Sequence, residues 1–357
     1  AVIRKRRYLS ASRFVPSMAS ANRPVEDSRP ECHPIRKVVV VGGTHGNEYT
    51  GVWCIKALER RLLTPAKAWP SLDVETLLSH PEAYKQNKRF IDTDLNREFS
   101  EKKLTGGEGN CTTTVESLRA RELDELLGPK FGDGDPKTDV IIDLHSTTTN
   151  MGISLIVQEG DVEMNRAAAY VSYKSGGEEG DARILMRTVP RKDLPGVVSL
   201  ARHGFTVEVG PVPQGVLRHD AVEKTERAMY FLLEYLELLN NDRVGVDTKL
   251  KDWYPEGKVP VFETSGKIEW PSDPENPNFP QVMVHKSVQD RDFLKIKKGD
   301  SLFVDLDGND IPYSGSHGEE VHLMFINEGG YYYSSSGTGI GVSVRREMRL
   351  SDGMFVN

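Results

Sequence analysis

Histidines and glutamates that suit metal-dependent hydrolysis stand where the sequence predicts the ends of strands. His45 and Glu48 fall in the segment GGTHGNE (42–48), which follows the apolar run 38–41, and His145 follows a second apolar run. Ligands of open α/β sheets bind at the carboxyl ends of strands, and the glycines allow a sharp turn that brings both side chains to one point. Two histidines and one glutamate are a zinc-ligand set of hydrolases, which leaves a fourth position for water.

Each motif alone has a simpler explanation. A Gly-Gly pair before a helix can form a phosphate loop, although no Lys-Ser or Lys-Thr follows here and Gly-x-Gly-x-x-Gly is absent. A lone histidine at a strand end is more often hydrogen-bonded than metal-bound. Two such motifs at matching strand ends together favour a metal site. Asp143 can orient His145 through a hydrogen bond, or can be an ordinary hydrogen-bond partner at the end of a strand.

Glu208 stands in the β-branched sequence Thr206-Val207-Glu208-Val209-Gly210. A charged glutamate is costly to bury without a partner, so the pattern has two interpretations. In one, the strand is half-exposed and alternate residues face water. In the other, Glu208 is a general base beside the metal, where it takes a proton from the attacking water and delivers it to the leaving amine.

An amide hydrolase also needs positive charge near the reacting carbonyl and near the substrate carboxylate. Arg89, Asn96 and Arg97 occur together in one short segment. Arginine binds carboxylates with a planar, two-pronged fork, so these residues are candidates for substrate binding. Taken alone, they would be interpreted as surface residues.

Strands alternate with helices in the hydrophobic pattern, which predicts an α/β fold with a mostly parallel sheet flanked by helices. The expected strands are 38–41, 140–144, 153–157 and 205–209, and the expected helices are 52–62, 116–127 and 223–239. After about residue 245, several prolines and the short strand-like pieces 281–284, 301–304 and 321–326 indicate a smaller β-rich domain. We therefore expect a basic, disordered N-terminal extension (1–34), a catalytic α/β domain (35–245) and a β-rich domain (246–357).

The composition disfavours several classes of protein. A net charge of -7 argues against a nucleic-acid partner, and no apolar run approaches the ~18 residues that span a membrane. Cys32, Cys54 and Cys111 include no CxxC pair, which is typical of reduced thiols in an intracellular protein, and the cytoplasm is the expected location. The first residues are basic, contain serine and lack acids before Glu26, so organelle import is an alternative.

Together these residues resemble the aspartoacylase family of zinc acylases, which are relatives of the zinc carboxypeptidases. The resemblance extends from about residue 36 to 333 and rests on motifs in the same order along the chain. They are GGTHGNEYTG (42–51), RFIDTDLNREF (89–99), DLHSTTTNMG (143–152), VEVGPVPQGVLR (207–218), QDRDF (289–293) and FINEGGYYY (325–333).

The resemblance implies a zinc-carboxypeptidase-like sheet, with a C-terminal domain that caps the active site and excludes large peptides. It implies one zinc ion per subunit and a small-molecule N-acyl amino acid substrate. Family members often form dimers, so a homodimer is compatible with it. The implied site residues are the zinc ligands His45, Glu48 and His145; the catalytic Glu208; Arg89, which polarises the scissile carbonyl; and Asn96, Arg97 and Tyr331, which hold the α-carboxylate.

One departure from the family pattern bears on the substrate. Aspartoacylases proper carry an arginine ten positions before the catalytic glutamate, and Val198 stands at that position here. Without a cation, the β-carboxylate of aspartate would be buried unpaired, at a cost of several kcal/mol. The chain is in this respect similar to the type-three aminoacylase, so we expect N-acetyl aromatic or apolar amino acids, or mercapturates, as substrates. The alternative is N-acetyl-L-aspartate.

Two further alternatives follow from the same residues. A zinc carboxypeptidase would cut a blocked dipeptide faster than a simple N-acetyl amino acid. A non-catalytic binding or scaffold protein on the same fold would bind metal without turnover, although the presence of all the candidate catalytic residues argues against it.

Overall fold

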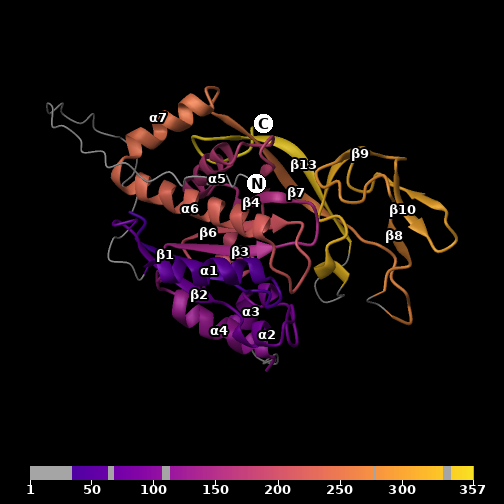
Figure 1. Cartoon of the computed structure of the whole chain (residues 1–357), viewed down its shortest axis with the longest axis horizontal. Coiled ribbons are helices and arrows are strands. Elements are labelled where there is room, and N and C mark those ends of the chain that lie inside the picture. Colours follow the sequence, from indigo (N-terminus) through magenta and orange to yellow (C-terminus); the bar gives the residue numbers. More distant parts are fainter. Residues whose placement is uncertain (1–33, 63–67, 107–112, 277–278, 333–338, 357) are drawn as a thin grey trace, which may run out of the picture. The chain divides into compact units, whose positions relative to one another are not determined.

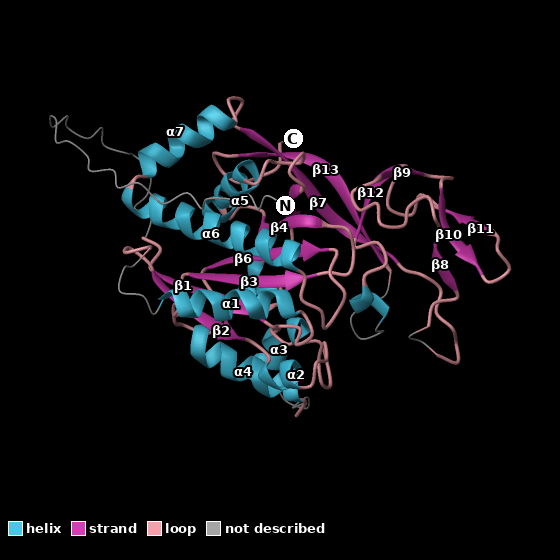
Figure 2. Cartoon of the chain, viewed as in Figure 1, coloured by secondary structure: helices cyan, strands magenta, loops and turns pink. Residues whose placement is uncertain are grey.

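Apolar runs of the sequence form the middle of a ten-stranded sheet in the computed structural model (Figures 1 and 2). The structure describes residues 34–62, 68–106, 113–276, 279–332 and 339–356. The strand order is β2-β1-β3-β6-β4-β5-β7-β13-β12-β9. The bounds of these strands are β1 (Lys37–Gly42), β2 (Asp73–Leu78), β3 (Val140–Ser146), β4 (Gly152–Gln158), β5 (Ala182–Arg187), β6 (His203–Gly210), β7 (Lys258–Ile268), β9 (Lys295–Lys297), β12 (Glu320–Met324) and β13 (Ile340–Arg349).

The sheet is parallel over most of its N-terminal part. Strands β2, β1, β3 and β6 run parallel to one another, as do β4, β5 and β7. The two sets meet where β4 pairs antiparallel with β6. Strands β7, β13, β12 and β9 form antiparallel pairs. The expected mostly parallel sheet with helices is therefore confirmed, and the C-terminal strands extend that same sheet.

Helices cover both faces of the parallel part of the sheet. They are α1 (Tyr49–Leu62), α2 (Pro81–Lys85), α3 (Glu101–Thr105), α4 (Val115–Leu127), α5 (Val162–Lys174), α6 (His219–Asn241) and α7 (Arg243–Trp253), with the 3-10 helices η1 (Leu95–Arg97), η2 (Arg191–Asp193), η3 (Val197–Leu200) and η4 (Gly329–Tyr332). Val38 and Val40 pack with α1, α5 and α6, whereas Val39 and Val41 pack with α4 and η3. This arrangement explains the unbroken apolar run of β1, because alternate residues of a strand face opposite sides.

The C-terminal part also contains a small three-stranded sheet with its own core. This sheet has the order β11-β10-β8 and consists of β8 (Val282–Val284), β10 (Ser301–Asp305) and β11 (Asp310–Pro312). Its apolar residues pack with those of β12 and β13. The β-rich character expected after residue 245 is thus confirmed.

Several details differ from the sequence prediction. Helix α6 begins at His219 rather than at residue 223, and β12 ends at Met324 rather than at residue 326. Helix α7 was not predicted, because it buries only Val246 and Leu250, and the expected boundary at 245/246 falls inside it. The long strands β7 and β13 were also missed, and Pro260 interrupts the pattern of the first.

The structure groups residues 35–357 in one compact unit. Their division into a catalytic domain and a β-rich domain at 245/246 stays a prediction. Cys32, Cys111 and the basic N-terminal segment lie outside the described residues, so the expectation of reduced thiols and the alternative of organelle import stay open. Cys54 is buried with a free thiol. Among the helices that the structure describes, none has the length and apolar character of a membrane span.

Candidate active site

The proposed metal ligands meet at the ends of two neighbouring parallel strands. His45 and Glu48 lie in the turn between β1 and α1, and His145 lies near the end of β3, the strand beside β1. All three side chains are buried, and their ligand atoms lie within 4.8 Å of one another. Among the residues that the structure describes, no other group of His, Cys, Asp or Glu is arranged in this way.

Glycines give the turn after β1 its shape. Gly43 has φ +68°, in the left-handed region that favours glycine. A Cβ atom at Gly46 would lie 2.2 Å from the backbone of Ala83, in the middle of α2. The turn can therefore pack tightly against α2, which fixes the positions of His45 and Glu48.

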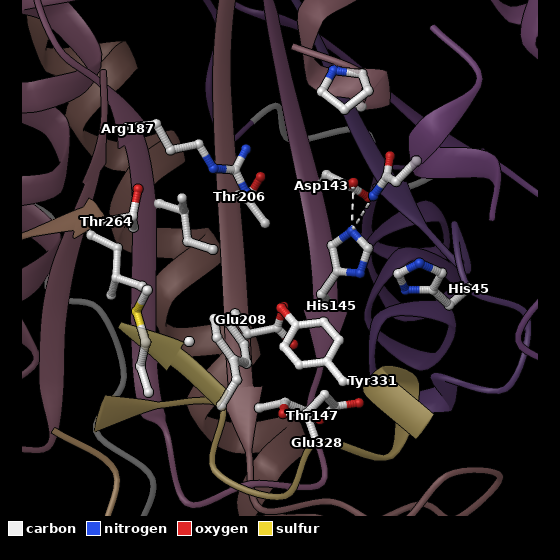
Figure 3. A pocket seen from close by; sticks show the side chains of 18 of the residues that line it. His45, Asp143, His145, Thr147, Arg187, Thr206, Glu208, Thr264, Glu328 and Tyr331 are labelled. Carbon is white, nitrogen blue, oxygen red and sulfur yellow. Dashed lines mark hydrogen bonds and ion pairs between the residues drawn. The ribbon is translucent and has the colours of Figure 1, made fainter. Parts of the chain in front are cut away.

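Both imidazole rings turn the Nδ1 atom toward the glutamate. The Nδ1 atoms of His45 and His145 lie 2.6 and 2.9 Å from the Glu48 carboxylate oxygens. Their Nε2 atoms face carboxylates. His45 Nε2 lies 3.1 Å from Asp94, and His145 Nε2 lies 2.6 Å from Asp143, a contact drawn in Figure 3. A carboxylate on the far nitrogen of a metal-binding histidine fixes its tautomer and leaves the other nitrogen for the metal.

Of the two interpretations of Asp143, the structure supports the one in which it orients His145 through a hydrogen bond. Asp94 plays the same part for His45 but was not singled out from the sequence. Its signal was its place in the motif 89–99, two residues before Asn96, whose backbone N–H donates to Asp94 at 2.9 Å. A further donor, the Thr44 hydroxyl, lies 2.8 Å from Asp143.

The charges of the ligand cluster compensate one another. Burial by itself would raise the pKa of Glu48, but His45 and His145 outweigh it and hold that pKa well below its usual value. Burial would likewise lower the pKa of His145, but Asp143 and Glu48 outweigh it and raise that pKa well above its usual value. The raised pKa of His145 favours a proton on this ring, and binding of a metal ion should release it.

Glu208 faces the same cavity as the ligand cluster. It lies on β6 in register with His145 on β3. Its neighbours Val207 and Val209 point into the main core, while Thr206 and Glu208 point toward the site (Figure 3). Burial raises the pKa of Glu208 to about 8, with Glu48 and Glu328 adding to it and His145 and Arg89 opposing it. The side chain is half-buried at the cavity and does not lie on an outer surface of the sheet.

The candidate substrate-binding residues surround this point. Arg89 is buried rather than on the surface, and it donates to Glu48 at 3.1 Å and approaches Asp94 at 3.6 Å. Asn96 Nδ2 lies 3.2 Å from His145 Nε2, and Arg97 lines the cavity beside it. Tyr331 reaches the cavity from η4, in the C-terminal part of the chain.

All these side chains line one cavity of about 430 Å³, a size that suits a small molecule. Its wall also contains residues that the sequence analysis missed: Arg187 from β5, Lys267 from β7 and Glu328 before η4. The Lys267 amine lies 3.3 Å from the centre of the Tyr331 ring. Arg187 and Lys267 belong to no recognisable motif, because only the sheet topology brings their strands to the site.

Glu328 connects the C-terminal part to the end of β3. Its carboxylate accepts hydrogen bonds from the backbone N–H of Thr148 at 2.9 Å, from the Thr147 hydroxyl and from the backbone N–H of Gly330 at 2.8 Å. Since Gly330 directly precedes Tyr331, these bonds fix where the tyrosine enters the cavity. The signal in the sequence was its position inside the motif 325–333.

Comparison with known proteins agrees with this geometry. Residues 34–236 match the family model of the succinylglutamate desuccinylase/aspartoacylase catalytic domain, and residues 257–340 match that of the AstE/AspA barrel-sandwich hybrid domain. The chain is 36% identical to a probable aspartoacylase of Nostoc sp. over 84% of this chain and 93% of the relative. It is 37% identical to N-acyl-aromatic-L-amino acid amidohydrolase (carboxylate-forming) A of Danio rerio, over 83% and 85%.

A solved structure has the same fold. Murine aminoacylase 3 superposes with a TM-score of 0.75 and 28% identity, over 91% of this chain and 99% of that chain. The catalytic-domain match alone covers more than half of the sequence. The chain belongs to the succinylglutamate desuccinylase/aspartoacylase family.

Proposed function

We propose that this chain is a zinc-dependent amidohydrolase that removes the acyl group from N-acyl-L-amino acids and releases a carboxylate and the free amino acid. The observation that carries the proposal is one cavity that combines a His-Glu-His ligand group, an acidic Glu208 and several cations. Relatives named N-acyl-aromatic-L-amino acid amidohydrolase and probable aspartoacylase support this reaction class.

The ligand group fits a zinc ion, one per subunit. Two imidazole nitrogens and one carboxylate are a catalytic zinc set that leaves a position open. In the structure, both Nδ1 atoms face Glu48 and both Nε2 atoms are held by aspartates, which is the orientation that such a set needs. A zinc ion held there supplies Lewis acidity and makes water a stronger acid.

The other residues act on the substrate and on its protons. Glu208 takes a proton from the attacking water and delivers it to the leaving amine, and its raised pKa suits a group that must hold that proton between the two steps. Arg89 donates to the carbonyl oxygen as negative charge develops on it. Asn96, Arg97 and Tyr331 hold the α-carboxylate, since an arginine fork and neutral donors match that group.

The class of amino-acid side chain depends on the wall of the cavity. Val198 lines it, as expected for the position ten residues before Glu208, together with apolar residues such as Leu185 and Leu194. This apolar wall favours an aromatic or apolar side chain. Arg187 and Lys267 line the same cavity and favour an acidic one.

The test is metal content together with release of acetate from a panel of N-acetyl-L-amino acids. We expect one zinc ion per chain and turnover that a chelator abolishes and added zinc restores. A blocked dipeptide should be cut more slowly than the N-acetyl amino acids. Zinc binding without turnover on any acyl substrate would instead support the binding or scaffold alternative, and the absence of zinc would refute the ligand assignment.

A further inference from the structure

Three consecutive backbone N–H groups, those of residues 91–93, donate to one buried carboxylate. The carboxylate belongs to Glu116, in the first turn of α4. It accepts from the N–H of Ile91 at 2.6 Å, of Asp92 at 3.2 and 3.3 Å, and of Thr93 at 3.1 Å. Successive backbone N–H groups that point to one place form a nest for an anion, and here the anion is a side chain of the same protein.

His80 completes the surroundings of this carboxylate. Its Nε2 atom lies 2.8 Å from Glu116, and its Nδ1 atom accepts from the backbone N–H of Ala83 at 3.4 Å. Since Nδ1 is an acceptor, the ring proton stands on Nε2, and His80 donates to Glu116. Burial by itself would raise the pKa of Glu116, but His80 and the backbone donors outweigh it and lower that pKa to about 2. The carboxylate is therefore ionised at neutral pH.

The segment that Glu116 holds carries two residues of the active site. It lies between α2 and η1, outside any helix or strand, so no ladder of backbone hydrogen bonds fixes its path. Arg89 stands two residues before the nest and donates to Glu48 at 3.1 Å. Asp94 directly follows the nest and lies 3.1 Å from His45 Nε2. The position of the nest therefore sets the position of both side chains.

Other contacts hold the residues that follow in the chain. The side-chain oxygen of Asn96 accepts from the backbone N–H of Val197 at 3.0 Å, and the backbone carbonyl of Arg97 accepts from the Lys103 amine at 3.0 Å. The two residues proposed to hold the α-carboxylate are thus positioned from outside the nest. The influence of Glu116 should fall on the metal site and on the scissile carbonyl rather than on the α-carboxylate.

We propose that Glu116 is a positioning residue, which acts on the metal site through Asp94 and on the scissile carbonyl through Arg89. This inference rests on the proposed function and adds to it a residue outside the active-site cavity. Glu116 lies outside the motifs of the family resemblance, and the described lining of the cavity does not include it. A carboxylate suits this role because it only accepts, whereas the amide of glutamine would turn two donors toward the backbone N–H groups.

The test is a double-mutant cycle on zinc affinity. The zinc dissociation constant is measured for the wild type, Glu116→Gln, Asp94→Asn and the double variant, by competition with a chromophoric chelator at fixed pH. We expect Glu116→Gln alone to weaken zinc binding about tenfold, since it displaces the carboxylate behind His45. Adding Glu116→Gln to Asp94→Asn should weaken binding by less than about twofold more, because both changes act through one contact.

Kinetics at saturating zinc give a second readout, which a loss of stability alone would not produce. Glu116→Gln should lower kcat about tenfold or more, since Arg89 is displaced from the carbonyl, whereas KM should change by less than about twofold. Glu116→Asp keeps the charge on a shorter side chain and should recover part of both losses. The matched control is Glu122→Gln on the same helix, which should match the wild type, because Glu122 pairs with Arg119 at the surface.

Four outcomes would overturn the assignment. They are an unchanged zinc affinity in Glu116→Gln, additive losses in the double variant, an equal loss in Glu122→Gln, and a raised KM with unchanged kcat in Glu116→Gln. If thermal unfolding shows that zinc-free Glu116→Gln is not folded, the same cycle with Glu116→Asp decides. Failure of the proposed function is distinguished, because the zinc cycle requires no turnover. A chain that binds zinc but cleaves no N-acyl amino acid would refute the reaction, and the cycle would still show whether Glu116 acts through Asp94.

Discussion

Replacing Asp94 by Asn should weaken zinc binding about 10- to 100-fold without unfolding the protein. Asp94 is buried, lies 3.1 Å from His45 Nε2, and also accepts from the backbone N–H of Asn96. Burial by itself would raise the pKa of Asp94, but His45 and Arg89 hold it below its usual value, so the side chain is ionised at neutral pH. Asparagine has the same shape and still offers one oxygen acceptor, so the substitution removes mainly the negative charge.

The size of the effect follows from what Asp94 does. It does not bind the metal, so its loss should cost less than the loss of a ligand. A carboxylate behind a ligating histidine fixes the tautomer and makes the other nitrogen a better donor, and its removal typically changes metal affinity 10- to 100-fold, which is about 1.4–2.8 kcal/mol. Asp143→Asn should have an effect of the same order, because Asp143 holds His145 in the same manner at 2.6 Å.

The measurement is the zinc dissociation constant, obtained by competition with a chromophoric chelator at fixed pH. The control is Asp92→Asn, two residues earlier in the same segment, because Asp92 accepts from the backbone N–H of Val115 and does not touch the ligand cluster. Thermal unfolding of the chelator-treated variants would show whether the fold is intact. An unchanged affinity in Asp94→Asn, or an equal loss in Asp92→Asn, would refute the assignment of Asp94 as an orienting residue.

Four other substitutions test the rest of the site and one titrating group. Glu208→Gln should keep one zinc per chain but lower kcat by about 10²- to 10⁴-fold, as measured by acetate release beside metal analysis. Gly330→Ala should lower kcat/KM about tenfold with little change in Tm, because its Cβ would lie 2.6 Å from Cζ of the buried Arg89. Glu328→Ala should raise KM about tenfold or more with zinc content unchanged, since it removes the hydrogen bonds from Thr148 and Gly330 that hold the segment before η4. Asp292→Asn should flatten the pH dependence of stability. Burial raises the Asp292 pKa to about 7, so the contribution of this group to wild-type stability is complete below the unfolded pKa of ~3.9 and falls as the pH rises toward 7. A Tm series from pH 4 to 8 measures this dependence, and the same slope in both proteins would refute it.

Patterns that follow from local burial were predictable from the sequence. The unbroken apolar runs of β1 and β3 indicated strands buried on both faces, and their ends gave the location of His45, Glu48 and His145. The ligand positions were predictable because parallel neighbours bring their carboxyl ends to one edge. Glu208 was ambiguous, since a period of two residues is the same for a solvent-facing strand and for one that faces a cavity.

Contacts that depend on tertiary structure were not predictable. Arg187 reaches the site only because β5 lies two strands from β6, with β4 between them, antiparallel to β6 and parallel to β5. No local pattern of β4 indicates this direction. Asp94 and Glu328 lie within the motifs 89–99 and 325–333, but their roles depend on hydrogen bonds to residues 49 and 180 positions away.

The charges of the cavity wall connect the metal site to the substrate. Its described lining has four acidic side chains, Glu48, Asp143, Glu208 and Glu328, and four basic ones, Arg89, Arg97, Arg187 and Lys267. Burial and the nearby arginines lower the pKa of Lys267 to about 8, so it is still mostly protonated at neutral pH. With the pKa of Glu208 raised to about 8, the described wall carries about one net positive charge at neutral pH without the metal, and a divalent ion between neutral histidines would add two more. A substrate with two carboxylates would compensate more of this excess than a substrate with one. Because uncompensated charge is costly in a water-poor cavity, metal binding and a dianionic ligand should favour each other. Zinc should therefore increase the affinity of the protein for L-aspartate by a larger factor than its affinity for L-asparagine.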